Sequence, residues 1–244
     1  MLTDEQKKRF IRDASDAQAK DFAAIANWLQ RRRITKLFHF THVDNLDSIF
    51  ENGFQTRQFL NETATSYFAS DNDRLDGFLE SISFSIGKPN SLLLSDKNFK
   101  LDHKMVLLEV AANNLLTQSF AALPGNAARG YFQDVLSNDH SRFLGIRGLA
   151  GMYLNEELRS KASLPLEEPT DIQAEILFFE PIDNSKILGM HVPERFPESD
   201  RDKVTKIMSK HPNLRCDYVC KCGYFIKLSG GPFRQYNIGW EING

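Results

Sequence analysis

Strand-like stretches recur along most of the chain, and this recurrence limits the folds open to it more than any other feature of the sequence. In residues 81–86 isoleucine and phenylalanine alternate with serine, which predicts a strand that is buried on one face. Residues 37–41, 105–110 and 172–179 read as further strands. Residues 186–192 also fit a strand, which we expect to lie beside 172–179 in a sheet.

Helical patterns begin the chain and recur between the strands. Residues 4–33 place apolar side chains at helical spacing among many charged residues, which predicts one or two amphipathic helices. Asp44 is suited to cap the N-terminus of a helix that Gly53 would end. Residues 111–116 and 198–210 also favour a helix.

The remaining segments show no strong period. Residues 55–80 are rich in polar side chains and are typical of a long functional loop. Residues 117–170 hold short helix-compatible pieces between glycines and prolines, and residues 216–244 indicate one or two strands. Because no internal repeat or low-complexity linker occurs, one α+β domain is the simplest architecture.

Charge and hydropathy exclude several classes of protein. The 30 lysines and arginines nearly balance the 32 aspartates and glutamates, so any nucleic-acid binding must be local rather than driven by an overall positive field. The apolar runs are far shorter than the roughly 20 residues of a membrane-spanning helix, and residues 1–20 lack the apolar part of a secretory signal. With only three cysteines, the sequence predicts a cytoplasmic protein that does not contact a membrane.

Glu175 is the most informative polar residue, because it interrupts an apolar strand-like run. A charge in such a run needs a partner or a function. Alternation places Gln173 and Glu175 on one face of the predicted strand. The alternative is that this face is solvated and that both are ordinary surface residues, and periodicity does not decide between the two.

His39 and Thr41 show the same geometry on an earlier predicted strand. Both would project from one face, with Phe38 and Phe40 on the other. A lone histidine in a strand is usually a structural residue. This pair by itself is therefore weak evidence for a site.

A cluster of thiols near the end of the chain raises the question of a metal. His211, Cys216, Cys220 and Cys222 are four candidate zinc ligands within a dozen residues. Their Cys-x3-Cys-x-Cys spacing differs from the paired knuckles of structural zinc sites. Free thiols in a pair of strands are the alternative, so the sequence leaves zinc open but does not predict a metal.

Four stretches of the chain, in their order, resemble one protein family. They are 37–46 (Leu-Phe-His-Phe-Thr-His-Val-Asp-Asn-Leu), 74–77 (Arg-Leu-Asp-Gly), 81–84 (Ser-Ile-Ser-Phe) and 169–177 (Pro-Thr-Asp-Ile-Gln-Ala-Glu-Ile-Leu). Together they resemble the DarT family of toxin ADP-ribosyltransferases. The second and third stretches are more similar to the guanine-modifying branch of that family than to the thymidine-modifying one.

The resemblance implies a fold and a division of the chain. The fold would be the ADP-ribosyltransferase fold, an α+β fold with a central split β-sheet, N-terminal helices and a C-terminal extension. The helical segment would cover residues 1–35, the catalytic core 36–195, and the extension 196–244, packed on the same domain.

The resemblance also implies an NAD+ site. Cleavage of the nicotinamide glycosidic bond generates an oxocarbenium-like ribose, which Glu175 would stabilise as the catalytic carboxylate. His39 would bind the adenosine-side ribose of NAD+, and Thr41 would help to seat the nucleotide. Asn45 and Arg74 would add polar contacts to NAD+.

Further residues would serve catalysis and the acceptor. In the family a basic residue after the serine-rich strand assists catalysis, and Lys88 is the nearest candidate, although the residues before it depart from the family pattern and an exposed turn lysine is the alternative. Gln173 would face the acceptor base. Arg129, Arg147 and Tyr131 would contact phosphates and stack on bases, with a plain surface role as the alternative for each.

The leading hypothesis is therefore an NAD+-consuming toxin that ADP-ribosylates a nucleic-acid base, by resemblance guanine in single-stranded DNA. Such toxins are generally paired with a macrodomain antitoxin that removes the modification. The first alternative is RNA as acceptor, as in a phage-defence toxin-antitoxin system that modifies messenger RNA. Two other hypotheses are a protein acceptor and a scaffold that binds the nucleotide without catalysis.

Overall fold

A seven-stranded sheet organises the part of the chain that the computed structural model describes, which is residues 2–69, 77–128 and 138–217. The strand order is β4-β5-β2-β1-β3-β6-β7. All neighbouring strands run antiparallel except β6 and β7, which run parallel. The bounds are Lys36–His42 (β1), Ile82–Ile86 (β2), Met105–Ala111 (β3), Phe120–Leu123 (β4), Glu175–Phe178 (β5), Ile187–His191 (β6) and Arg215–Asp217 (β7).

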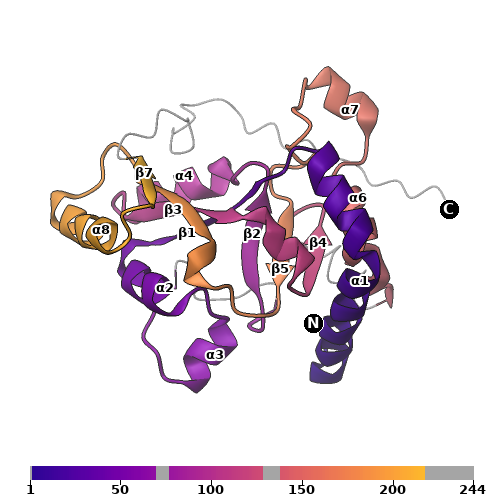
Figure 1. Ribbon diagram of the computed structural model, residues 1–244, viewed down its shortest axis with the longest axis horizontal. Coiled ribbons are helices and arrows are strands. Elements are labelled where there is room, and N and C mark those ends of the chain that lie inside the picture. Colours follow the sequence, from indigo (N-terminus) through magenta and orange to yellow (C-terminus); the bar gives the residue numbers. More distant parts are fainter. Residues whose placement is uncertain (1, 70–76, 129–137, 218–244) are drawn as a thin grey trace.

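Helices cover both ends of this sheet. In Figure 1, α1 and α6 lie along the β4 end, whereas α8 lies at the β7 end. The α-helices are Asp4–Arg31 (α1), Leu46–Asn52 (α2), Arg57–Glu62 (α3), Ser91–Lys100 (α4), Gly145–Gly151 (α6), Glu156–Lys161 (α7) and Glu198–Lys210 (α8). Short 3-10 helices are Val43–Asn45 (η1), Ala112–Leu116 (η2), His140–Phe143 (η3) and Asn184–Lys186 (η4).

The long helix α1 has a clear start and a buried face. The Thr3 hydroxyl accepts a hydrogen bond from the Gln6 amide, and the Gln6 side chain accepts one from the Thr3 amide, which is a capping box. Asp4 and Glu5 add negative charge at the N-terminus, where the helix dipole favours it. The apolar side chains that face the protein are Phe10, Ala14, Ile25, Trp28 and Leu29.

One apolar core runs through the centre of the protein. It includes Trp28 of α1, Leu108 of β3, Ile176 of β5 and Val204 of α8, all of which are buried. Side chains from the N-terminal helix, the sheet and the last helix therefore share one interior. On this basis we propose that the described residues of the segments 1–35, 36–195 and 196–244 form one packed unit; residues 218–244 of the last segment lie outside the described part of the chain.

The structure confirms three strands and corrects a fourth. Residues 37–41 and 105–110 lie in β1 and β3, and residues 82–86 of the predicted 81–86 form β2. The predicted strand 172–179 is wrong at its start, because β5 begins only at Glu175.

A turn takes the place of the missing strand residues. The amides of Gln173 and Ala174 donate to the side chain and the carbonyl of Asp171. Gln173 therefore does not share a strand face with Glu175, contrary to the prediction. The apolar residues in 172–179 made the whole segment resemble a strand.

The predicted neighbour of β5 is also wrong. β6 pairs with β3, whereas β5 lies between β2 and β4. β4 was not predicted, because its four residues, Phe-Ala-Ala-Leu, are too few and too rich in alanine to show alternation.

The helices predicted at residues 4–33 and 198–210 are confirmed, as are the helix that ends at Gly53 (α2) and, as the 3-10 helix η2, the short helix at 111–116; other details are corrected. Of the predicted residues 4–33, residues 4–31 form the single helix α1, and 198–210 form α8. Asp44 does not cap α2, because it lies inside η1 and its carboxylate pairs with Lys203. The supposed loop 55–80 contains α3, and α4 was missed entirely.

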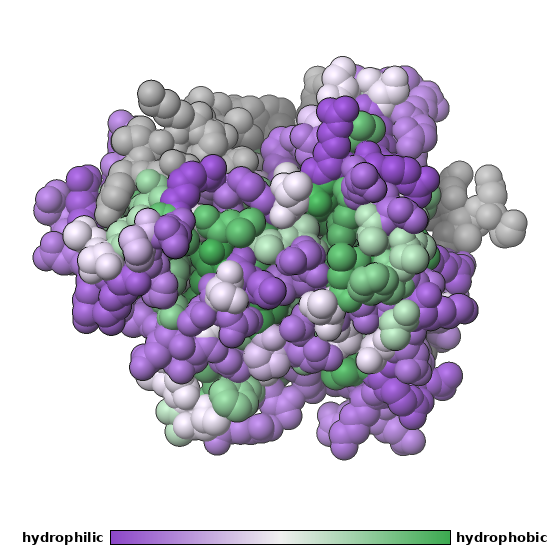
Figure 2. All heavy atoms as spheres, in the orientation of Figure 1, coloured by the Kyte–Doolittle hydropathy of each residue, from purple (hydrophilic) through white to green (hydrophobic). Residues whose placement is uncertain are grey.

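The surface is mostly hydrophilic on the face drawn in Figure 2, where apolar side chains gather beside α1 and α6 and nearer the centre of the sheet. Within the described ranges, no helix has an apolar stretch long enough to cross a bilayer.

Candidate active site

The sheet splits between β1 and β2. β1 is paired with β3 along its whole length, but its ladder with β2 consists of two residue pairs, Leu37 with Ile86 and Phe38 with Ser85. Beyond these pairs the two strands part, and a cavity opens between their diverging ends.

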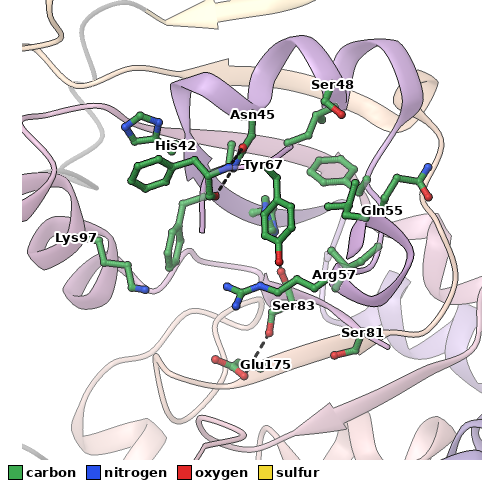
Figure 3. Close-up of a pocket in the computed structure, with 18 of the residues that line it drawn as sticks. His42, Asn45, Ser48, Gln55, Arg57, Tyr67, Ser81, Ser83, Lys97 and Glu175 are labelled. Carbon is green, nitrogen blue, oxygen red and sulfur yellow. Dashed lines mark hydrogen bonds between the residues drawn. The ribbon is translucent and has the colours of Figure 1, made fainter. Parts of the chain in front are cut away.

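Polar side chains from several elements line this cavity (Figure 3). Four of the residues predicted from the sequence meet there: His39, Thr41, Asn45 and Glu175. Positions that are 130 residues apart in the chain thus lie on one cavity. Its other polar lining residues within the described ranges are His42, Ser48, Gln55, Arg57, Tyr67, Ser81, Ser83, Lys97 and Asn126.

The carboxylate of Glu175 is held by hydrogen bonds on both of its oxygens. Oε1 accepts a bond of 3.0 Å from Asn126 Nδ2, and Oε2 accepts bonds of 3.3 Å from the Ala127 amide and 3.4 Å from the Ser83 hydroxyl. The side chain is only partly buried, so it remains accessible from the cavity. A carboxylate fixed by three donors is oriented before any ligand binds.

Sheet pairing explains how these donors reach Glu175. β4 and β5 are antiparallel, with Leu123 opposite Glu175, so the residues that follow β4 pass over the first residue of β5. Asn126 is itself fixed there, because its Oδ1 accepts a hydrogen bond from the Ala128 amide. The third donor, Ser83, comes from β2 on the other side of β5.

His39 is fixed at the point where β1 and β2 part. Its Nδ1 lies 2.9 Å from the Ser83 carbonyl oxygen, and because a carbonyl can only accept, Nδ1 carries the proton. The ring packs against Phe54 and Phe84, with centroids 5.1 and 5.2 Å away. In a neutral ring Nε2 is then the acceptor nitrogen.

Asn45 connects β1 to the opposite wall of the cavity. Its Nδ2 donates to the Thr41 hydroxyl and to the Phe68 carbonyl, both at 2.9 Å, and its Oδ1 accepts from the Phe68 amide at 2.7 Å. The Phe68 ring stacks on His42 with a centroid distance of 3.8 Å. Burial lowers the pKa of His42, which favours the neutral ring in this stack.

Two basic side chains line the cavity from helices that the sequence analysis missed. Arg57 belongs to α3 and Lys97 to α4. In Figure 3 their charged groups point into the cavity from opposite sides. Because α3 buries none of its residues, it has no apolar pattern that could have revealed it.

The other predicted site residues lie elsewhere or outside the described ranges. Lys88 does not line the cavity, and its ammonium pairs with Glu168 at 3.1 Å. Gln173 lies in the turn before β5, and Arg147 is exposed on α6, where it donates to the Ser141 hydroxyl. The predicted residues outside the described part of the chain are Arg74, Arg129 and Tyr131.

The thiol cluster lies largely outside the described residues, since Cys220 and Cys222 fall beyond residue 217. Of its other members, Cys216 is in β7, and the His211 ring lies 5.1 Å from that of Phe50. Among the residues that the structure covers, no group of histidine, cysteine, aspartate or glutamate is arranged to hold a metal ion.

A comparison with protein families matches residues 38–225 to the family described as "DarT: ssDNA thymidine ADP-ribosyltransferase, DarT". None of the curated proteins is similar enough in sequence to count as a match.

Several solved structures are similar to this chain. One is Thermus sp. 2.9 DarT in complex with NAD+, at 16% identity over 79% of this chain and 98% of that chain, with a TM-score of 0.45. The same Thermus protein in complex with ADP-ribosylated ssDNA matches at 16% identity over 79% and 96%, with a TM-score of 0.42. Thermosipho africanus DarTG in complex with ADP-ribose matches at 15% identity over 78% of this chain, with a TM-score of 0.47. This chain covers only 51% of that Thermosipho chain.

Proposed function

The chain belongs to the DarT family of ADP-ribosyltransferases, and from this premise we propose that it transfers ADP-ribose from NAD+ to a base of single-stranded DNA at the cavity between β1 and β2. The observation that carries the proposal is the oriented carboxylate of Glu175 at the same cavity as His39 and Thr41.

Glu175 has the charge and the position that the reaction requires. In the transfer the bond between C1′ of the ribose and the nicotinamide nitrogen breaks, its electron pair leaves with nicotinamide, and positive charge develops on the ribose. A fixed carboxylate stabilises that charge electrostatically. A nitrogen of the acceptor base then bonds to C1′ and loses its proton, and Glu175 is the nearby group that can accept it.

The remaining polar residues suit the rest of the dinucleotide. His39 Nδ1 donates a hydrogen bond to the Ser83 carbonyl. Nε2 of the neutral ring is therefore an acceptor, which suits a bond from a ribose hydroxyl. Arg57 and Lys97 are the cations that we assign to the two negative charges of the pyrophosphate. In this assignment Lys97 takes the place that the sequence analysis gave to Lys88, because Lys97 lines the cavity.

The acceptor is the finer part of the proposal. The stretches 74–77 and 81–84 favour guanine by resemblance, whereas the family description names thymidine. We propose guanine in single-stranded DNA, with thymidine and RNA as the outcomes that would replace it.

The test is transfer of label from NAD+ that is radiolabelled in its adenylate phosphate. The purified protein is incubated with DNA and RNA oligonucleotides of matched sequence that differ at one base, and the labelled nucleosides are identified by mass spectrometry. We expect label on DNA that contains guanine. Label on thymidine would replace guanine, label on RNA alone would end the DNA proposal, and label on added protein alone would end the nucleic-acid proposal.

Glu175→Gln tests the role of the carboxylate, and Glu180→Gln is its matched control. Glu180 lies just beyond the same strand, bonds to the Ser119 hydroxyl at 2.9 Å, and does not line the cavity. Loss of one preorganised electrostatic group typically lowers kcat by roughly 100- to 1,000-fold. We expect that loss for Glu175→Gln and near-normal transfer for Glu180→Gln. Equal transfer activity in the two variants would show that Glu175 is not the catalytic carboxylate.

The resemblance also leads us to propose a macrodomain antitoxin as partner. Expression of the protein should then slow bacterial growth, and co-expression of a macrodomain hydrolase that releases ADP-ribose from DNA should restore it. Toxicity that the hydrolase leaves unchanged, in cells whose DNA carries the modification, would contradict this part of the proposal.

A further inference from the structure

Asn45 has a hydrogen-bonding role that differs from the direct NAD+ contact expected of it. Its amide group is engaged on both sides by the backbone of Phe68, whose N–H donates to Oδ1 and whose carbonyl accepts from Nδ2. An N–H can only donate and a carbonyl can only accept, so the amide cannot be flipped. Both Nδ2 hydrogens are then assigned, one to Phe68 and one to the Thr41 hydroxyl.

The fixed amide determines the polarity of Thr41. Because Asn45 Nδ2 donates to Thr41 Oγ1 at 2.9 Å, that oxygen is an acceptor in this bond, and the hydroxyl proton must be directed elsewhere. Thr41 is buried, with 6% of its surface exposed, yet it lines the cavity. Within residues 2–69, 77–128 and 138–217 its hydroxyl has no acceptor for that proton.

We propose that Asn45 is a positioning residue that makes Thr41 a hydrogen-bond donor to an acceptor atom of NAD+, and that Asn45 itself does not contact the dinucleotide. The proposal rests on the function proposed above. It deepens that function by naming the polarity of one ligand contact and the residue that sets it.

The side-chain amide of Asn45 also connects Thr41 to Phe68, which forms part of the cavity wall. The Phe68 ring stacks on His42, the residue next to Thr41, so one side chain holds both the donor and the wall beside it. A carboxylate at position 45 would reverse the arrangement. It would accept the Thr41 proton, so that no donor faces the cavity, and it would repel the Phe68 carbonyl.

The experiment measures the affinity for carba-NAD+, whose carbocyclic ring cannot form the oxocarbenium ion, by calorimetry at pH 8. Thr41→Ser retains the hydroxyl, and Thr41→Val removes it at nearly constant shape. We expect Thr41→Ser to bind within about twofold of wild type. Thr41→Val and Asn45→Asp should each bind about tenfold more weakly, the usual effect of losing one net hydrogen bond.

The combination of the two variants separates positioning from direct contact. If Asn45 acts through Thr41, then Asn45→Asp should weaken binding by less than about twofold once Thr41 is valine. A direct contact would instead give effects that multiply to about a hundredfold, and this result would overturn the proposal.

Two further outcomes are decisive. If Asn45→Asp fails to fold, the Thr41 pair still tests the polarity, since equal binding by serine and valine at position 41 would refute a donor at this position. A wild-type protein that does not bind carba-NAD+ at all would refute the proposed function. Wild-type binding with multiplying effects would refute only the role of Asn45.

Discussion

Replacement of Glu109 by glutamine should destabilise the protein by an amount that depends on pH. Glu109 of β3 is buried, with 4% of its surface exposed, and its carboxylate contacts His191 at 3.0 Å, Lys36 at 2.7 Å and Arg215 at 2.8 Å. Burial raises the pKa of Glu109, but hydrogen bonds from His191 and Lys36 outweigh burial and lower the pKa from 4.5 to about 2. The ionised carboxylate is therefore much more stable in the folded protein than its neutral form.

The size of the effect follows from this shift. One pKa unit corresponds to about 1.4 kcal/mol, so the fall from 4.5 to about 2 contributes about 3 kcal/mol to the free energy of unfolding. Because the folded-state pKa lies below the unfolded one, the contribution is complete above pH 4.5 and is lost as the pH falls toward 2. Glu109→Gln should thus cost about 3 kcal/mol at pH 7 and about half of that at pH 3.

Urea denaturation at pH 7, 5, 4 and 3 measures the difference between wild type and Glu109→Gln. Glu157→Gln is the control, because that glutamate is exposed on α7 and its pair with Lys161 is a surface contact. Such a substitution usually changes stability by less than about 0.5 kcal/mol. A loss for Glu109→Gln that stays constant from pH 7 to pH 3 would refute the electrostatic reasoning, and a loss below about 1 kcal/mol at pH 7 would refute its magnitude.

Three further predictions concern the cavity and its frame. Asn126→Ala removes one of the donors that orient Glu175 and should lower kcat by about tenfold with little change in KM for NAD+, as measured by steady-state transfer. Lys97→Ala should raise KM for NAD+ severalfold, whereas Lys88→Ala should leave KM nearly unchanged. If Lys88→Ala raised KM and Lys97→Ala did not, Lys88 would be the cation that serves the reaction. Gly53→Ala should lower the thermal midpoint by several degrees, because Gly53 has a φ of 74° and an added Cβ would lie 2.4 Å from a backbone carbonyl.

The sequence predicted those strands whose own residues show a recognisable strand pattern. In β2, serines alternate with apolar residues, and the apolar run of β3 is broken only by Glu109, so both are visible without knowledge of their neighbours. The pairing partners depend on contacts between distant segments. For this reason β6 was placed beside the wrong strand, and β5 was extended over a turn whose apolar residues, Ile172 and Ala174, are not in a strand.

The residues of the candidate site also differ in whether the sequence alone could reveal them. His39, Thr41 and Glu175 lie in strands, and the family resemblance singled them out. Arg57 lies in a short helix with no buried residue, so nothing in the pattern distinguished it from a surface arginine. The roles of Asn45 and Asn126 are hydrogen-bonding roles toward Phe68 and Glu175, and these contacts exist only in three dimensions.

The split between β1 and β2 gives a physical reason for the position of the site. β1 pairs with β3 along its whole length, and β2 pairs with β5 through residues 82–84. The inner edges of β1 and β2 beyond their two shared residue pairs therefore face the cavity. The Ser83 carbonyl on this inner edge accepts from the His39 ring instead of a backbone amide. Buried polar groups must be paired, so a side chain takes over the bond that a continued ladder would have made. The two strands can therefore stay apart at the place where a ligand rich in donors and acceptors would bind. His39, which satisfies the Ser83 carbonyl there, is also a residue that would hold that ligand.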